Sequence, residues 1–290
     1  QAAEYFHNHI VATGSKPVSA RNRLNNLRRF LERYGDCKLT EITRFDVDSY
    51  LVSLPENELS RSTLRSYVKS LKQFWRWCHE YKLVEENITA HLIAPREGQM
   101  RRIKAMTLDS YGAMLNACKN SRDLAILAFM GDTDVRPVEL YQLRMEYLYL
   151  DEREAHVYGK TRTIDEPRIV DYTHATVDIL RNYLEERPDV EHPYVFTKLK
   201  APHKPITYVT LRMLFQRLAK AAGVESNGTA KSVRHLVGQR FTVEKNLELA
   251  RQKLGHSHIK TTMVYANIDR TIVKAATAEL SVVDQIKEGC

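Results

Sequence analysis

The sequence predicts a mainly α-helical protein of two domains, with a small antiparallel β-sheet in the second domain. Apolar residues recur at helical spacing along most of the chain. Three short segments of strand composition lie between residues 147 and 170. A polar, basic stretch with Pro95 and Gly98 separates two regions of helical pattern. We therefore expect a helical domain at 1–88, a linker at 89–106, a second domain at 107–270 and a C-terminal helix at 271–290.

The composition fits this size. With 290 residues, of which 43% are hydrophobic, the chain can build two buried cores. No apolar run is long enough to cross a membrane, so we expect none to be involved. The scattered cysteines show no metal-ligand spacing and fit a reducing compartment, which predicts a cytoplasmic protein without a metal site. The four are Cys37, Cys78, Cys118 and Cys290.

Three helices are predicted in the first domain. The helix at 20–34 is followed by one at 41–54, which ends before Pro55 because proline cannot continue a helix. The third helix runs from a cap at Ser60 or Ser62 to about Tyr81. Its apolar stripe is Leu64, Val68, Leu71, Trp75 and Cys78.

The other side of this third helix is basic. Five cations follow one another at steps of three or four residues: Arg61, Arg65, Lys69, Lys72 and Arg76. Such a ridge can be a solvated helix face, but five cations without an interleaved carboxylate favour contact with DNA. Arg101 and Arg102 in the predicted linker are further candidates for this contact. The net charge of +8 and the pI of about 9.2 also favour a polyanionic partner.

The second domain mixes helices with three strands. Thr107 can open its first helix, and Pro137 occupies the first turn of a short one, where proline is tolerated. Strand composition is found at 147–150, 156–158 and 168–170, with a polar turn at 159–166. Further helices are predicted at 122–131, 137–143, 175–186, 207–222, 230–243, 247–254 and 259–265, with an extended piece at 193–196.

Three motifs in this domain carry the functional argument. They are TDVRPVEL at 133–140, SVRH at 232–235 and LGHSHIKTTMVY at 254–265. Together they resemble the tyrosine recombinase (phage integrase) family, over about Thr107 to Tyr265. The helical N-terminal region looks like the core-binding domain of that family, so the resemblance implies a two-domain DNA clamp. Its catalytic positions fall on Arg136, Lys160, Lys231, Arg234, His256 and Tyr265.

The chemistry of these residue types agrees with the resemblance. Attack on a phosphodiester raises negative charge on its non-bridging oxygens, and the guanidiniums of Arg136 and Arg234 can pair with those oxygens without a metal. The phenol of Tyr265 is the predicted nucleophile. Lys160, in the polar turn, can protonate the leaving 5′ oxygen. His256 would donate a hydrogen bond to a non-bridging oxygen. No cofactor is expected.

Three further residues have supporting or undecided roles. The family usually has histidine where this chain has Lys231, which can either contact the phosphate or accept the phenol proton. Glu139 is expected to anchor the arginine site through an ion pair. His235 resembles a packing or orienting residue of the family rather than a substitute catalyst.

The resemblance implies a site-specific recombinase that acts on inverted half-sites in double-stranded DNA. It would form a 3′-phosphotyrosyl intermediate and a Holliday junction, as a tetramer on two DNA sites, in integration, excision or resolution of a mobile element near the nucleoid. The amphipathic segment 271–287 could dock on a neighbouring subunit or on its own core. A type IB topoisomerase and a non-catalytic DNA-binding protein are the alternatives.

Overall fold

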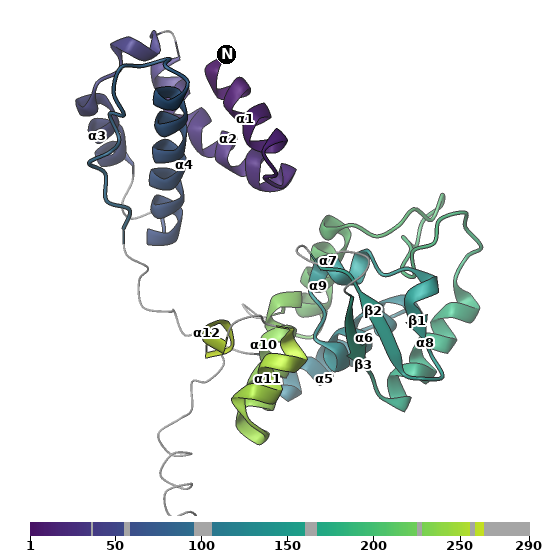
Figure 1. Cartoon of the computed structure of the whole chain (residues 1–290). Coiled ribbons are helices and arrows are strands. Elements are labelled where there is room, and N and C mark those ends of the chain that lie inside the picture. Colours follow the sequence, from purple (N-terminus) through teal and green to yellow (C-terminus); the bar gives the residue numbers. More distant parts are fainter. Residues whose placement is uncertain are drawn as a thin grey trace, which may run out of the picture. The chain divides into compact units, whose positions relative to one another are not determined.

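A computed structural model describes residues 1–35, 37–54, 59–95, 106–159, 167–224, 228–255 and 259–263. The chain divides between Arg101 and Arg102 into two compact units, and each is described by itself (Figure 1). Within the described ranges, no helix combines the length and the apolar character needed to cross a membrane. The predicted C-terminal helix and residues 96–105 of the predicted linker lie outside these ranges.

The first unit is helical throughout. Its elements are α1 (Ala2–Ala12), α2 (Pro17–Tyr34), the 3₁₀ turn η1 (Leu39–Glu41), α3 (Arg44–Ser53) and α4 (Arg61–Glu80). Helix α2 packs against both α1 and α4. Phe6, Phe30, Phe74 and Trp75 are almost fully buried between these helices. Helix α1 was not predicted as a separate element.

Two details of this unit sharpen the sequence interpretation. Ser60, rather than Ser62, caps α4, since its hydroxyl accepts a hydrogen bond from the backbone N–H of Thr63. The first residues of the predicted linker pack on the unit: Thr89 is fully buried, and Lys72 donates to the backbone carbonyls of Ala90 and Leu92. Residues 89–95 are therefore held against α4.

The second unit surrounds a buried helix with other helices and a small sheet. Helix α6 (Ser121–Thr133) packs against α8 (His174–Glu186), α10 (Ala230–Glu244) and strand β3 (Arg168–Asp171) (Figure 1). Its side chains Ile126, Leu127 and Phe129 lie in the main hydrophobic core. The other helical elements are α5 (Leu108–Asn116), α7 (Pro137–Tyr141), η2 (Met145–Tyr147), α9 (Tyr208–Ala221), α11 (Leu247–Leu254) and α12 (Ile259–Thr262).

The sheet has three antiparallel strands in the order β1-β2-β3. They are β1 (Leu148–Tyr149), β2 (Glu154–Val157) and β3 (Arg168–Asp171). Val157 pairs with Arg168, and Ala155 with Val170. These four side chains are buried while Ile169 is exposed, as the two-residue repeat of a strand requires. The predicted mainly helical fold with a small antiparallel sheet is confirmed.

Candidate active site

Arg136 lies at the start of α7, and its own helix fixes its side chain. Glu139, one turn further on, accepts a hydrogen bond from the Arg136 guanidinium at 2.8 Å and another from the Arg136 backbone N–H at 2.8 Å. The Glu139 side chain is 2% exposed, whereas that of Arg136 is 36% exposed. The buried Glu139 therefore holds the guanidinium on one side, and the rest of the guanidinium is accessible to solvent. This is the ion pair that the sequence predicted for Glu139.

Arg234 is buried in α10 and contacts two distant segments. Its guanidinium donates to the Leu254 carbonyl at 2.7 Å and to the Asp134 carbonyl. Its Nη1 also lies 3.3 Å from Oδ2 of Asp134. Asp134 stands two residues before Arg136, and Leu254 two residues before His256. Arg234 thus joins the segments that carry two other predicted catalytic residues.

A third arginine, Arg168 of β3, links Glu139 to the segments that Arg234 contacts. It donates to Oε2 of Glu139 at 2.6 Å, to the Asp134 carbonyl at 3.4 Å and to the Lys253 carbonyl at 2.9 Å. Gly255, with φ of 60°, lies so close that a Cβ there would be 2.3 Å from the Arg168 side chain. The backbone angle favours glycine, and any larger residue would displace the Arg168 side chain. We call Asp134, Arg136, Glu139, Arg168 and Arg234 the arginine cluster.

Neighbouring groups and burial set the charges of Glu139, Arg168 and the adjacent His235. Burial opposes the charge of Glu139, but Arg168 and the backbone N–H and guanidinium of Arg136 outweigh it and hold its pKa below the ordinary value. Burial lowers the pKa of Arg168, which Glu139 opposes. His235, buried next to Arg234, has its pKa lowered to about 4 by burial and by the nearby Lys231 and Arg234. It is therefore neutral near pH 7.

The structure brings together part of the predicted site. Arg136, Glu139 and Arg234 belong to one cluster, and Lys231 is exposed on the first turn of α10, three residues before Arg234 and so on the same face. His235 is buried on the same helix. Lys160, His256 and Tyr265 lie outside the described residues.

Asp134 and Arg168 were missed by the sequence interpretation. Arg168 was assigned only to a strand, yet an arginine at an inward position of a buried strand needs a partner, which is a detectable signal. Asp134 was quoted only as a letter of the motif around Arg136. Nothing local in the sequence indicates that its carbonyl accepts hydrogen bonds from arginines 34 and 100 positions away.

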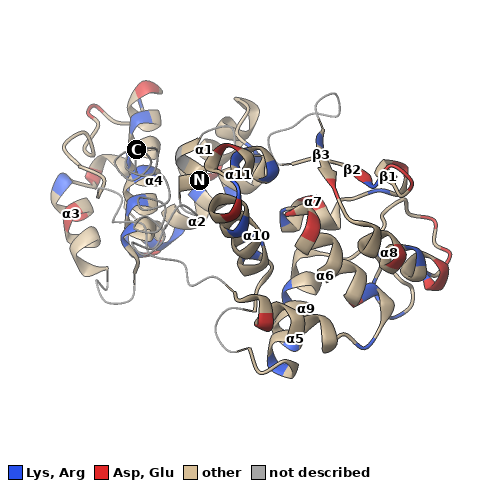
Figure 2. Cartoon of the chain, turned by 90° about the horizontal axis from the view of Figure 1, so that it is seen from below, with Lys and Arg blue, Asp and Glu red and all other residues tan. Residues whose placement is uncertain are grey.

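The α4 basic ridge divides into two sets. Figure 2 shows lysine and arginine positions in blue along α4. Arg61, Lys69 and Arg76 are exposed. Arg65 and Lys72 are half-buried and donate to carbonyls of the segment 89–95. Arg101 and Arg102 lie outside the described residues.

Helix α2 carries a second basic face that the sequence interpretation did not single out. Its exposed residues Arg21, Asn25, Arg28 and Arg29 share one side because they recur at four-, three- and one-residue steps. Asn25 interrupts this series of arginines, which made the basic face less conspicuous in the sequence.

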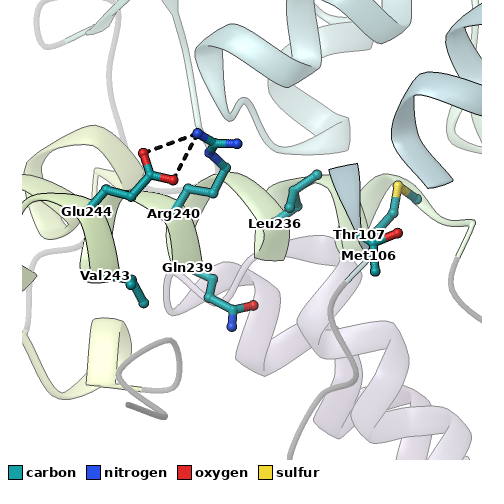
Figure 3. Close-up of a pocket in the computed structure, with 7 residues that line it drawn as sticks. All are labelled: Met106, Thr107, Leu236, Gln239, Arg240, Val243 and Glu244. Carbon is teal, nitrogen blue, oxygen red and sulfur yellow. Dashed lines mark hydrogen bonds and ion pairs between the residues drawn. The ribbon is translucent and has the colours of Figure 1, made fainter. Parts of the chain in front are cut away.

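A separate cavity of about 460 Å³ lies on another side of α10 (Figure 3). Val243, one of its lining residues, comes nine positions after Arg234 and so points to the opposite side of the helix. The ion pair between Arg240 and Glu244 spans its rim. None of its seven lining residues is a predicted catalytic residue: they are Met106, Thr107, Leu236, Gln239, Arg240, Val243 and Glu244. The cavity is therefore not the candidate site.

Comparison with known proteins gives a consistent result. Tyrosine recombinase XerC of Neisseria meningitidis serogroup C is 28% identical over 240 residues, which are 79% of this chain and 76% of that protein. Tyrosine recombinase XerD of Listeria innocua is 24% identical over 289 residues, 93% and 95% of the two chains. The structure of the Tn1549 transposon integrase in complex with a circular intermediate DNA has a TM-score of 0.74 at 16% identity, covering 97% of this chain and 99% of that one.

The family model described as the phage integrase family matches residues 104–271, more than half of the chain. This range contains the whole arginine cluster and the three motifs that carried the resemblance. The predictions of the family and of the enzyme class, a tyrosine site-specific recombinase, are confirmed. The chain belongs to the phage integrase family of tyrosine recombinases.

Proposed function

We propose that this recombinase binds inverted half-sites in double-stranded DNA and exchanges strands through a covalent 3′-phosphotyrosyl intermediate and a Holliday junction. The arginine cluster is the observation that supports this most strongly. Arg136 and Arg234, which are 98 positions apart in the sequence, are attached to one buried set of carboxylates and carbonyls. Preorganised cations of this kind are what a pentacoordinate phosphorus transition state requires.

In the proposed reaction, the phenol of Tyr265 loses its proton to solvent water, and its oxygen forms a bond to phosphorus as the bond from phosphorus to the 5′ oxygen breaks. Lys160 gives its proton to that leaving oxygen, and Arg136 and Arg234 carry the added charge on the non-bridging oxygens. His256 donates to one of the same oxygens. The reverse reaction, with a 5′ hydroxyl from the partner duplex, rejoins the strand without a further energy source.

Lys231 is assigned to phosphate contact in this proposal. A lysine becomes an effective proton acceptor when it is desolvated, and Lys231 is exposed on the first turn of α10. Its position one turn before Arg234 suits an ammonium that contacts the same phosphate or its neighbour. Glu139 and His235 act through the arginines rather than on DNA.

The assembly is proposed to be a tetramer on two DNA sites, in which the segment from Thr271 docks on a neighbouring copy. Removing residues 271–290 should then abolish pairing of two sites while a single site is still bound. Gel-shift assays with one and two labelled duplexes measure both properties. Unchanged recombination by the shortened chain would exclude docking in trans.

We assign the biological role to integration, excision or resolution of a mobile element, in the cytoplasm at the nucleoid. The direct test is a covalent adduct between the protein and nicked duplexes made from DNA that neighbours the gene. Wild type should give an adduct that resists denaturation, and Tyr265→Phe should give none. Tyr208→Phe, an exposed tyrosine of α9, is the matched control and should behave like wild type.

The same preparation separates the alternatives. Relaxation of a supercoiled plasmid that contains none of the adduct-forming sequences would favour a type IB topoisomerase. Binding without any adduct would favour a non-catalytic DNA-binding protein. An adduct restricted to particular duplexes, with no general relaxation, is the outcome that the proposal expects.

A further inference from the structure

Asp134 occupies an unusual backbone position in the arginine cluster. It ends α6 in the left-handed region, with φ of 55°, and its side chain is completely buried. Few residues other than glycine adopt this conformation; aspartate and asparagine are the commonest exceptions. The conformation turns the Asp134 carbonyl toward the guanidiniums of Arg168 and Arg234, and both donate to it.

The carboxylate of Asp134 has a different environment from its carbonyl. Oδ2 lies 3.3 Å from Nη1 of Arg234. Neither carboxylate oxygen accepts a hydrogen bond from the described residues, and both are buried. A buried carboxylate without hydrogen bonds is costly, so its charge depends on the cations around it. Its neighbour Glu139, by contrast, accepts hydrogen bonds on both oxygens.

Charged groups face Asp134 from each neighbouring element. They are Arg234 from α10, Arg168 from β3, Lys253 from α11 and the carboxylate of Glu139 from α7. Three cations therefore lie around the carboxylates of Asp134 and Glu139, and Arg136 is a fourth that pairs with Glu139. Glu139 is already paired with Arg168 and Arg136, which leaves Asp134 as the counter-ion of Arg234.

We propose that Asp134 is a positioning residue whose carboxylate balances Arg234 in the free enzyme and is replaced in that role by the scissile phosphate, with uptake of one proton. The proposal rests on the proposed function, because it takes Arg234 as a phosphate ligand. The proton comes from solvent and forms an O–H bond on the Asp134 carboxylate; no other bond changes. The Asp134 carbonyl keeps both guanidiniums in place throughout.

The balance of charge explains why the proton is needed. Burial raises the pKa of Asp134 to about 7, and Arg234 and Arg168 oppose this only in part. Near neutral pH, the free enzyme therefore holds a mixture of ionised and protonated Asp134. A phosphate on Arg234 brings another negative charge and occupies the cation that stabilised the carboxylate, so protonation becomes more favourable.

The first test needs no DNA. Because the pKa of Asp134 in the folded state lies above its ordinary value of 3.8, the folded state binds more protons between these values, and wild type loses stability as pH rises through this window. Asp134→Asn has nearly the same shape, tolerates the left-handed conformation and does not titrate. Its Tm relative to that of wild type should increase from pH 5 to pH 8. A Tm difference that does not change with pH would contradict the assignment.

The deciding test is proton uptake on binding, measured by titration calorimetry at pH 7.5 in two buffers with different ionisation enthalpies. The probe is the version without a nick of the duplex on which wild type forms the covalent adduct, and Tyr265→Phe protein is used to prevent cleavage. This protein should take up about half a proton or more beyond the uptake of the Tyr265→Phe, Asp134→Asn double variant.

A second duplex keeps the test independent of how the Asp134 variant folds. A neutral methylphosphonate replaces the scissile phosphate in this duplex. The proton uptake of the Tyr265→Phe protein should then be smaller by the same fraction of a proton. Equal uptake on the charged and neutral duplexes overturns the proposal. If wild type forms no adduct on any duplex, the proposed function has failed, while the Tm comparison still reports on Asp134.

Discussion

Cations are arranged in opposite ways in the two units of this chain. The arginines of the cluster are held by named acceptors, and two of the three are buried. On α4, Arg61, Lys69 and Arg76 are exposed and repeat along one face. The first arrangement fixes a few charges at one point and shields them from water. The second spreads exposed charges along one face of a helix.

This difference separates two tasks that a DNA-cleaving enzyme must perform. Stabilising a transition state needs donors fixed where the charge develops, and burial strengthens them. Holding a duplex needs many cations that can each neutralise one phosphate, at a cost in salt sensitivity. We infer that the arginine cluster sets the rate of cleavage and that the exposed part of the ridge contributes to affinity.

The largest expected effect is that of Arg234→Lys. Lysine keeps the charge, but its single ammonium cannot reproduce the fork that spans the Asp134 and Leu254 carbonyls. Cleavage at saturating DNA should fall by about 100-fold or more, with affinity changed only a few-fold. Arg212→Lys on the exposed face of α9 is the control and should leave the rate unchanged. A Kd effect that exceeds the rate effect would reverse the roles assigned to the two regions.

Glu139→Gln should lower the free energy of unfolding. The change leaves the buried Arg168 without its carboxylate, and breaking a buried ion pair typically costs about 3–5 kcal/mol. The wild-type contribution is present above pH 4.5 and is lost as pH falls through the lowered pKa of Glu139. The free energy of unfolding of the variant should therefore depend less on pH in acid. Urea unfolding between pH 3 and 7 measures this; parallel curves for the two proteins would contradict the ion-pair account.

The combined change of Arg61, Lys69 and Arg76 to glutamine should weaken affinity alone. If each cation neutralises one phosphate, the slope of log K against log salt should become smaller by about 0.9 for each, so by two to three in total. The maximum rate should stay within about twofold of wild type, because the buried cluster is untouched. A fluorescence anisotropy titration at several salt concentrations gives the slope. An unchanged slope would remove the ridge from the DNA interface.

Lys72→Met is expected to have the smallest effect on DNA binding. The Lys72 ammonium holds the carbonyls of Ala90 and Leu92, and such a charged hydrogen bond contributes about 1.5–3 kcal/mol. The variant should lower the free energy of unfolding by an amount of this order and change the salt slope less than Lys69→Met does. A change in slope for Lys72→Met that equals or exceeds the change for Lys69→Met would show that the half-buried set of the ridge also binds DNA.

The sequence predicted the helices best where local signals were strong. Thr107, Thr207 and Asn246 cap helices whose starts were expected from the sequence. An ion pair of Glu139 with the arginine site was also predicted, and its partner Arg136 lies within one turn. These features depend on neighbours only three or four positions apart.

The parts that could not be predicted depend on contacts between distant segments. Arg168 meets Glu139 across 29 positions and Lys253 across 85, and no local pattern encodes either contact. The same holds for Lys72, whose charge suggested DNA but whose ammonium also holds the chain at Ala90 and Leu92. A charged residue in a sequence shows its type, and only the fold shows whether it faces solvent or a buried acceptor.

The most direct measurement is the salt dependence of adduct formation by the wild-type enzyme, with Kd and the rate at saturating DNA taken from the same titrations. Between about 50 and 200 mM salt, Kd should rise by orders of magnitude, because binding by the exposed cations releases counterions from DNA. The saturating rate should change by less than about twofold, since buried charges are poorly screened. A saturating rate that falls in parallel with affinity would contradict the separation of the two charge arrangements.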